Sequence, residues 1–270
     1  MGEQMMHWRR ALAATLAACL VLCGSGASAW AAPASVARAE DPADVALVQG
    51  GFEVVTQGGI LALSPRIAAL EAMLARAPQS FPSWERHGDV LFVRPNDNGE
   101  IEGLIAEAQA QGGARPKSVQ VGYNVYPLAS LLLGSYWNEV HEPAKAVAAM
   151  DRGLALQPRN GVLVGERGTA LADLKKFDQA VASYDAWLAS GTGTDLQRAR
   201  ILRARGFSLI ELNRLDEAEQ NYLDSLKLEP CHAGARNELA YIAGRRTGTE
   251  HSSPSKLVTY DKAKGTCSPA

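Results

Sequence analysis

The sequence predicts a mainly α-helical chain in which about three helix-turn-helix repeats stack into an α-solenoid closed by a capping helix. The first observation is a glycine, an alanine and a bulky residue that recur three times at the same spacing: Gly134, Ala146, Met150; Gly168, Ala180, Tyr184; Gly206, Ala218, Tyr222. The second is that Pro158 and Pro230 follow two of these triplets at equal distance, where proline ends a helix because it lacks the backbone N–H. A single hairpin of this kind cannot bury its apolar side, so the repeats must stack.

The spacing of these residues resembles the tetratricopeptide repeat, a helix-turn-helix unit of about 34 residues. The first two triplets start 34 residues apart, and the second and third start 38 apart. Three copies are expected at 127–160, 161–194 and 199–232, followed by a capping helix at 233–244, so that the stack spans 127–246. The resemblance covers somewhat under half of the chain, and all three copies lack the tryptophan of the family pattern.

Each copy should contain two helices: 127–139 with 143–156, 162–174 with 178–189, and 195–213 with 216–228. The four extra residues between the second and third copies equal about one helical turn, so the first helix of the third copy should be one turn longer. Thr194 or Asp195 is expected to cap that helix. In every copy the glycine should face the alanine, so that the two backbones approach closely and the bulky residue fills the space beside them.

Residues 1–31 have the features of a bacterial signal peptide. Arg9 and Arg10 precede an apolar run at 11–23 that is too short to span a bilayer, and Ala27-Ser28-Ala29 is a small-x-small cleavage site. We therefore expect an exported protein, periplasmic or secreted, with no transmembrane span after cleavage.

A second interpretation of this segment is a lipoprotein signal. Leu16-Ala17-Ala18-Cys19 resembles a bacterial lipobox, which would leave a lipid anchor on Cys19 and place the protein in envelope assembly. In both cases a flexible lead-in is expected at 32–44, because this stretch contains Ala, Pro and acidic residues without periodicity.

Residues 45–126 form a small N-terminal section for which two interpretations stay open, an α/β fold or divergent helical hairpins. The α/β interpretation rests on runs of strand-favouring residues at 90–93 and 118–121 and on a helix expected at 100–111. The interpretation as divergent helical hairpins rests on Trp84, which precedes a glycine by four residues, as in the first helix of a repeat. The section is expected to pack on the first repeat and cap that end of the stack.

Two elements are expected earlier in this section. The runs at 52–55 and 60–63 flank a Gln-Gly-Gly turn and predict a short β-hairpin. Ser64-Pro65 then predicts the start of a helix, with serine as N-cap and proline at the first helical position. The apolar face of that helix consists of Ile67, Leu70, Met73 and Leu74.

The chain carries no recognisable catalytic motif, and a net charge of -2 gives no sign of nucleic-acid binding. We expect a non-enzymatic protein without a metal or another cofactor. The alternative is an enzymatic or small-molecule site in the N-terminal section, in a polar pocket containing His87 and Asp89. The segment 94–100 resembles a calcium loop, but Arg94 stands at the first ligand position, so a polar turn before a helix is expected.

Cys231 and Cys267 remain after signal cleavage and are expected to form a disulfide in an oxidising compartment. Cys231 lies in the turn before the capping helix, and the tail at 247–270 is long enough to return to it. Two alternatives are free thiols and a zinc site made from these cysteines with His232 and His251.

The resemblance to tetratricopeptide repeats implies a scaffold that binds a protein or peptide segment in a concave groove, lined mainly by the first helix of each unit. Carried over to this chain, the groove positions are Ser135, Asn138, Glu139, Glu166, Thr169, Asp173, Arg200, Arg203, Phe207, Glu211, Asn237, Glu238, Tyr241 and Arg245. Arginine and aromatic residues anchor many interfaces, so an acidic or aromatic-containing peptide is expected toward the C-terminal half. A subclass that binds C-terminal carboxylates has Lys and Asn where this chain has Leu131 and Ser135, so that binding mode is not expected.

Overall fold

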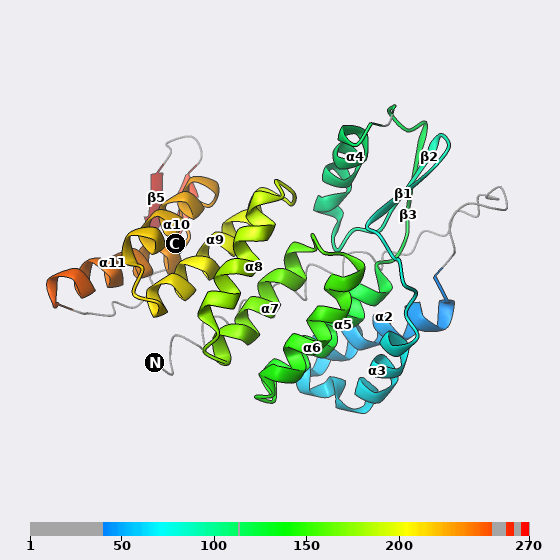
Figure 1. Cartoon of the computed structure of the whole chain (residues 1–270), viewed down its shortest axis with the longest axis horizontal. Helices are drawn as coiled ribbons and strands as arrows, with labels where there is room; N and C mark the ends of the chain where they lie inside the picture. Colours follow the sequence, from blue (N-terminus) through cyan, green and yellow to red (C-terminus); the bar gives the residue numbers. More distant parts are fainter. Residues whose placement is uncertain (1–39, 113, 250–257, 262–265, 270) are drawn as a thin grey trace. The chain divides into compact units, whose positions relative to one another are not determined.

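The computed structural model describes residues 40–112, 114–249, 258–261 and 266–269, and the chain divides into two compact units between Glu166 and Arg167 (Figure 1). The predicted signal peptide, Cys19 and most of the predicted lead-in lie outside the described residues. Helices dominate both units, which confirms the mainly α class. Within the described ranges, no helix combines the length and the apolarity that crossing a membrane requires.

Helical structure starts earlier than predicted in the N-terminal unit. α2 (Pro42–Gly58) begins inside the predicted lead-in, where the Asp41 carboxylate accepts a hydrogen bond from the backbone N–H of Ala43 at 2.9 Å. α2 and the 3-10 helix η2 (Ile60–Arg66) replace the predicted hairpin, which is wrong. The physical reason is a helical period: the buried residues of α2 include Val48, Phe52 and Val55.

The helix predicted after Ser64-Pro65 is α3 (Ile67–Ala75). All four residues of its predicted apolar face are buried, which confirms the face. Its predicted start is wrong, because Ser64 lies within η2 and no side chain caps α3. α2, η2 and α3 pack against α5 (Val125–Glu139), the first helix of the first repeat, and share one hydrophobic core with it. The N-terminal section therefore packs on the first repeat, as expected.

A three-stranded sheet lies between these helices in the sequence. β1 (Trp84–His87) pairs antiparallel with β2 (Val90–Val93), and β2 pairs parallel with β3 (Ser118–Val121). α4 (Ile101–Ala110) makes the crossover from β2 to β3. The α/β interpretation is thus confirmed for this stretch, and the extra repeat at Trp84 is wrong.

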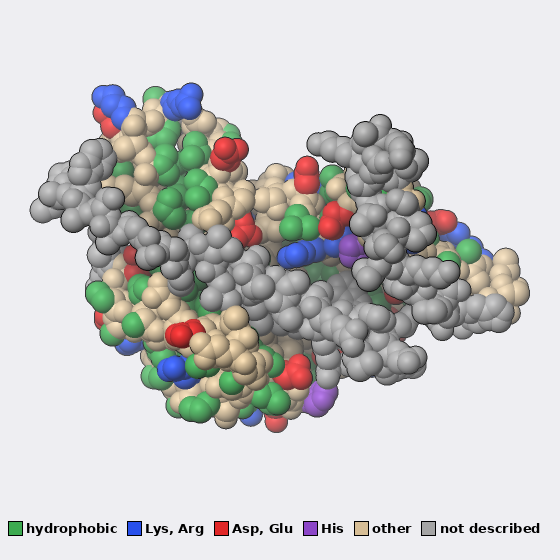
Figure 2. Space-filling view, turned by 180° about the vertical axis from the view of Figure 1, so that it is seen from behind, with side chains coloured by type: hydrophobic (Ala, Val, Ile, Leu, Met, Phe, Trp, Pro, Cys, Tyr) green, Lys and Arg blue, Asp and Glu red, His purple; other side chains and the backbone are tan. Residues whose placement is uncertain are grey.

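α4 covers only part of the sheet. Leu91 and Val93 of β2 are fully buried in a small core with Ala108 of α4. β3 is an edge strand, and its Val119 and Val121 stay 37% and 49% exposed. Figure 2 shows hydrophobic side chains at the surface of the lobe that the sheet and α4 form.

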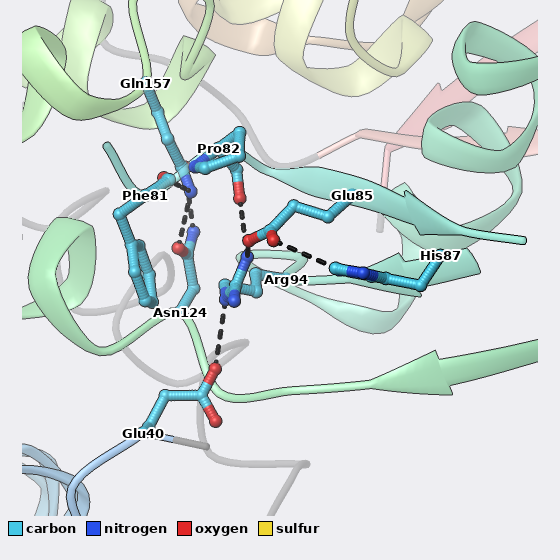
Figure 3. A network of polar contacts seen from close by, with 8 residues as sticks. All are labelled: Glu40, Phe81, Pro82, Glu85, His87, Arg94, Asn124 and Gln157. Atoms are coloured by element: carbon cyan, nitrogen blue, oxygen red, sulfur yellow. Dashed lines mark hydrogen bonds and ion pairs between the residues drawn. The ribbon is translucent and has the colours of Figure 1, made fainter. Parts of the chain in front are cut away.

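The buried guanidinium of Arg94 holds the base of the sheet to its surroundings (Figure 3). It is 2% exposed, and it donates to Glu40 at 3.0 Å, to the carbonyl of Pro82 at 3.0 Å and to Glu85 at 2.5 Å. It also lies 4.3 Å from the ring centroid of Phe81. A buried charge needs such partners, because an unpaired one would be costly to desolvate.

Two buried amides join the loop before α5 to the end of the first repeat. Gln157 donates to Asn124 at 2.7 Å, Asn124 donates back to Gln157 at 3.1 Å, and Gln157 also donates to the carbonyl of Phe81 at 3.2 Å. The pair is visible beside Arg94 in Figure 3. Residues from three separate parts of the chain are therefore fixed together without a charged group.

The predicted helices of the repeats are confirmed to within two residues at each end. They are α5, α6 (Pro143–Leu156), α7 (Gly161–Asp173), α8 (Phe177–Ala189), α9 (Asp195–Glu211) and α10 (Leu215–Leu228), followed by the capping helix α11 (Ala233–Thr247). α9 has 17 residues and α7 has 13, which confirms the extra turn. Thr194 caps α9 in a capping box with Gln197.

The glycine of each repeat lies against the bulky residue of the second helix. A methyl group added to Gly134, Gly168 or Gly206 would meet Met150, Tyr184 or Tyr222. The three alanines are fully buried, but none is among the nearest atoms to that methyl position. The missing side chain of each glycine therefore makes room for a large one from the second helix, which confirms that the bulky residue fills this space.

The C-terminal tail returns to the start of α11, as predicted. β4 (Val258–Asp261) and β5 (Thr266–Pro269) pair antiparallel, and Cys267 of β5 forms a disulfide with Cys231 across a Cα–Cα distance of 5.6 Å. The disulfide uses both cysteine sulfurs, so the zinc alternative loses two of its four ligands; His251 lies outside the described residues. Closing a loop of 36 residues stabilises the fold by about 4 kcal/mol in the chain-entropy model.

The glycine contact predicts the effect of a single methyl group. Gly168→Ala places a Cβ inside the contact distance of the Tyr184 ring, so we expect the free energy of unfolding to fall by about 1–3 kcal/mol. Gly103→Ala is the matched control, because Gly103 is an exposed helical glycine whose added methyl meets nothing within 4 Å. The control should gain about 0.5–1 kcal/mol. Urea unfolding of both variants measures the difference, and equal stabilities would contradict the contact.

Candidate binding face of the C-terminal unit

The predicted groove residues fall on both sides of the division between the units. In the N-terminal unit, Ser135 and Asn138 of α5 are 1% and 8% exposed, so they are core residues rather than an open binding surface. Their side-chain polar atoms have no hydrogen-bond partner among the described residues. Glu139 is half-buried, and so is Glu166, although one of its carboxylate oxygens is fully buried. These positions offer little surface to a partner.

In the C-terminal unit, two helices present the remaining candidates as stripes. Arg200, Arg203, Phe207 and Glu211 follow one another at three- and four-residue steps on α9. On α11 the neighbours Asn237 and Glu238 are followed by Tyr241 and Arg245 at three- and four-residue steps from Glu238. Steps of this size place side chains on one face of a helix. Thr169 and Asp173 of α7 are half-buried at the start of this unit. We define the C-terminal face as the stripes of α9 and α11.

Arg203 is the centre of the C-terminal face but is not a free cation. It is 7% exposed, and its guanidinium donates to Glu229 at 2.6 Å. Burial lowers the pKa of Arg203, and the Glu229 carboxylate offsets part of that fall. Glu229 was not predicted as a site residue from the sequence; it stands at the C-terminal cap of α10, directly before the helix-ending Pro230. This ion pair removes one of the two arginine charges expected to attract an acidic peptide.

Glu238 is half-buried and forms no ion pair with a described residue. Burial, with a smaller contribution from the neighbouring carboxylate of Glu211, raises the pKa of Glu238 to about 7. The charge of Glu238 also adds to the burial that raises the pKa of Tyr222, whose hydroxyl has no hydrogen-bond partner among the described residues. The α11 stripe therefore contains a carboxyl that titrates near neutral pH.

His232 starts α11. Its Nδ1 accepts a hydrogen bond from the backbone N–H of Ala235 at 3.1 Å, so the imidazole acts as the N-cap of the helix. Burial lowers the pKa of His232 to about 4, and the positive charge of Arg203 contributes. The ring is consequently neutral at physiological pH, which suits its role as an acceptor. From the sequence, His232 was a candidate only as a metal ligand, because histidine is not among the preferred capping residues.

The aromatic residues and Arg245 are held in place by neighbours. Phe207 meets Phe177 edge to face with ring centroids 6.4 Å apart. Arg245 donates to the carbonyl of Ile210 at 3.3 Å and lies 6.0 Å from the ring of Tyr241. Phe207, Tyr241 and Arg245 remain half-buried, so part of each reaches the surface. A preorganised aromatic and cationic surface of this kind costs little entropy on binding.

His87 and Asp89, the residues of the second candidate site, contact different partners. His87 lies 3.3 Å from Glu85, whereas Asp89 forms an exposed ion pair with Lys117 at 2.6 Å. Burial would raise the pKa of Glu85, but hydrogen bonds and charge from Arg94 hold it below its usual value. The two residues thus contact different partners, and the described residues contain no group of three or more His, Cys, Asp or Glu suited to a metal.

The segment resembling a calcium loop is a polar turn. Asp97 accepts a hydrogen bond from the backbone N–H of Gly99 at 2.8 Å, and Glu100 accepts one from the backbone N–H of Asn96 at 2.6 Å. The carboxylates thus satisfy backbone donors at the start of η3 (Asn98–Glu100) and α4, which confirms the expected turn.

No protein-family model matches the chain. The chain is 32% identical to RNA polymerase II-associated protein 3 from Homo sapiens over 168 residues, which cover 61% of this chain and 24% of that protein. It thus spans about a quarter of the length of the curated relatives it matches.

Two solved structures resemble the chain. The structure described as "MamA RS-1 ArsTM double mutant" has a TM-score of 0.51 at 12% identity and covers 78% of this chain and 89% of that one, which shows the fold alone. The first tetratricopeptide domain of Spaghetti (RPAP3), bound to the HSP90 peptide SRMEEVD, has a TM-score of 0.39 at 27% identity and covers 44% and 93%. The likeness with a TM-score of 0.51 supports a mainly α-helical stack of tetratricopeptide type, and the structure adds a small three-stranded sheet near the N-terminus.

Glu238 makes the stability of the protein pH-dependent. Its pKa rises from 4.5 to about 7 on folding, so between these values the unfolded chain has lost a proton that the folded chain keeps. We expect the free energy of unfolding contributed by this group to fall as the pH rises from about 4.5 to about 7. Glu238→Gln should remove that part of the fall. Urea unfolding of both proteins across this range measures it.

His232 supplies a control of opposite sign. Its pKa falls from 6.5 to about 4 on folding, so its contribution is complete above about pH 6.5 and is lost as the pH falls through about 4. His232→Asn keeps an N-cap acceptor and should remove only this acid-side loss. If the wild type and Glu238→Gln have the same pH slope, Glu238 does not carry the raised pKa.

Proposed function

We propose that this tetratricopeptide-repeat protein is a non-enzymatic exported scaffold that binds a peptide or protein segment in the concave groove of its stack, on the C-terminal face. One observation carries the proposal: Phe207 of α9 and Tyr241 of α11 are half-buried aromatics, with Phe207 packed against Phe177 and Tyr241 beside Arg245. Aromatic and arginine side chains dominate binding energy at interfaces because they bury a large area with little loss of side-chain freedom.

The charges of the face refine the expected ligand. Glu229 neutralises Arg203, so the arginines that can attract a carboxylate are Arg200 and Arg245. Arg200 is half-buried and makes no ion pair with any described residue. A pKa of about 7 leaves part of the Glu238 population protonated at neutral pH, which lessens its repulsion of an acidic ligand. A peptide with an aromatic residue near an acidic one fits this combination.

An enzymatic or small-molecule site in residues 45–126 has less support. His87 and Asp89, the residues on which that alternative rested, are engaged by Glu85 and Lys117 and point to different partners. Neither lies beside a nucleophile or a metal site among the described residues. The sheet instead contributes structure through Arg94.

Removing the two aromatics tests the proposed face. We expect Phe207→Ala combined with Tyr241→Ala to reduce capture of a partner from an envelope extract by about tenfold or more, since each hot-spot aromatic contributes roughly 1–2 kcal/mol. Leu223→Ala is the matched control, because Leu223 is a 43% exposed apolar residue on α10. Both variants should keep cooperative thermal unfolding. Undiminished capture by a folded double variant would refute the face.

Export is proposed from the N-terminal sequence. Arg9 and Arg10, the apolar run at 11–23 and the Ala27-Ser28-Ala29 site together support a cleaved signal peptide. Mass spectrometry of the envelope fraction should find a mature protein that begins after Ala29 or Ala31. A mature chain that begins at an acylated Cys19 would instead establish the lipoprotein alternative, and an uncleaved cytoplasmic chain would reject export.

A further inference from the structure

A groove in the N-terminal unit lies apart from the proposed binding face. It has a volume of about 520 Å³ and runs between α3 and α6, with α5 as its floor. In Figure 1 these three helices are labelled in the same part of the N-terminal unit. α3 and α6 each pack on α5. A space of this size between two helices that share a floor is wide enough for a third element.

The two walls of the groove are built from matching stripes. Ala68, Glu71, Ala72 and Ala75 line it from α3, and Lys145, Ala148, Ala149 and Arg152 line it from α6. In both stripes the residues are separated by three, one and three positions, which is the spacing of one helix face. Small side chains on both walls allow the backbone of an inserted helix to come close. The geometry therefore suits a helix more than an extended chain.

The floor offers an aromatic surface. Leu133 is buried, but Trp137 is half-buried and reaches the groove. The Lys145 ammonium lies 4.5 Å from the centroid of the Trp137 ring, which places a cation at the edge of the apolar floor. A partner that covers a half-buried tryptophan beside alanines gains binding free energy, because apolar area is removed from water.

The charges of the two walls differ. The α6 wall carries Lys145 and Arg152, seven positions or about 10 Å apart along the helix. Lys145 has only a loose, exposed contact of 3.9 Å with Glu142, and Arg152 makes no ion pair with any described residue. The α3 wall carries Glu71. A helix with two carboxylates two turns apart on one side would complement the two positive charges of the α6 wall.

We propose that this groove binds an acidic amphipathic helix of a partner protein. Two carboxylates two turns apart on that helix face Lys145 and Arg152, and small aliphatic residues pack between the alanine walls onto Trp137. Helices bind to grooves in this way through anchors at i, i+3, i+4 and i+7 positions. This second surface lets one scaffold hold two segments at once, and it does not depend on the C-terminal face.

A designed peptide tests the groove on the mature chain. The probe is an amphipathic helical peptide of about 16 residues with glutamates at positions i and i+7 and alanine and leucine on the adjoining face. We expect it to shift the indole N–H resonance of Trp137, assigned with Trp137→Phe, in a saturable manner. Arg152→Glu should weaken binding by about fivefold, and a peptide with lysines in place of the glutamates should prefer this variant over the wild type.

Further variants separate binding in this groove from binding elsewhere on the protein and from self-association. Ala72→Glu adds bulk and negative charge to the α3 wall at an exposed position, so it should weaken the probe without unfolding the protein. Phe207→Ala with Tyr241→Ala should leave the probe's affinity unchanged, which distinguishes this groove from the C-terminal face. The proposal is overturned if the Trp137 signal does not saturate, if Arg152→Glu binds equally well, or if the wild type self-associates through the groove and Ala72→Glu abolishes that association.

Discussion

The close contact between a glycine on the first helix and a large side chain on the second is the constraint on which each repeat depends. Met150, Tyr184 and Tyr222 occupy the space that a side chain at the glycine would fill. The large residue can therefore be almost fully buried, at 0–1% exposure, while the two helices stay close. The constraint is local to each hairpin, so it recurs with the repeat and fixes where the polar stripes on the remaining faces can lie.

The N-terminal unit uses a different kind of constraint, because its parts come from distant stretches of sequence. Arg94 must be paired once it is buried, and its partners Glu40 and Glu85 both precede it in the sequence, by 54 and 9 residues. The amides of Asn124 and Gln157 satisfy each other in the same region. These contacts hold the sheet while α2, α3 and α5 form a separate apolar core. The groove between α3 and α6 is lined by the helices of this unit and not by residues of the sheet.

The residue types of the candidate face predict the positions of its side chains but not their ionisation states. The stripes of α9 and α11 follow from helical spacing, and their residues were predictable once the repeats were aligned. The ionisation states of those residues were not predictable from the sequence. Arg203 pairs with Glu229 from the end of another helix, and the pKa of Glu238 depends on burial. Both effects need distances between elements, which the spacing within one helix does not contain.

The sequence by itself determined the repeat boundaries, the extra turn of α9, the capping helix and the Cys231–Cys267 pair, because each depends on local spacing, a helix terminus or the parity of cysteines. Only the tertiary structure decided that 52–63 is helical, since a β-like run of residues can also follow a helical period when one side is buried. It also decided that Ser135 and Asn138 belong to the interior. Burial results from packing between segments, and no pattern within a single segment specifies it.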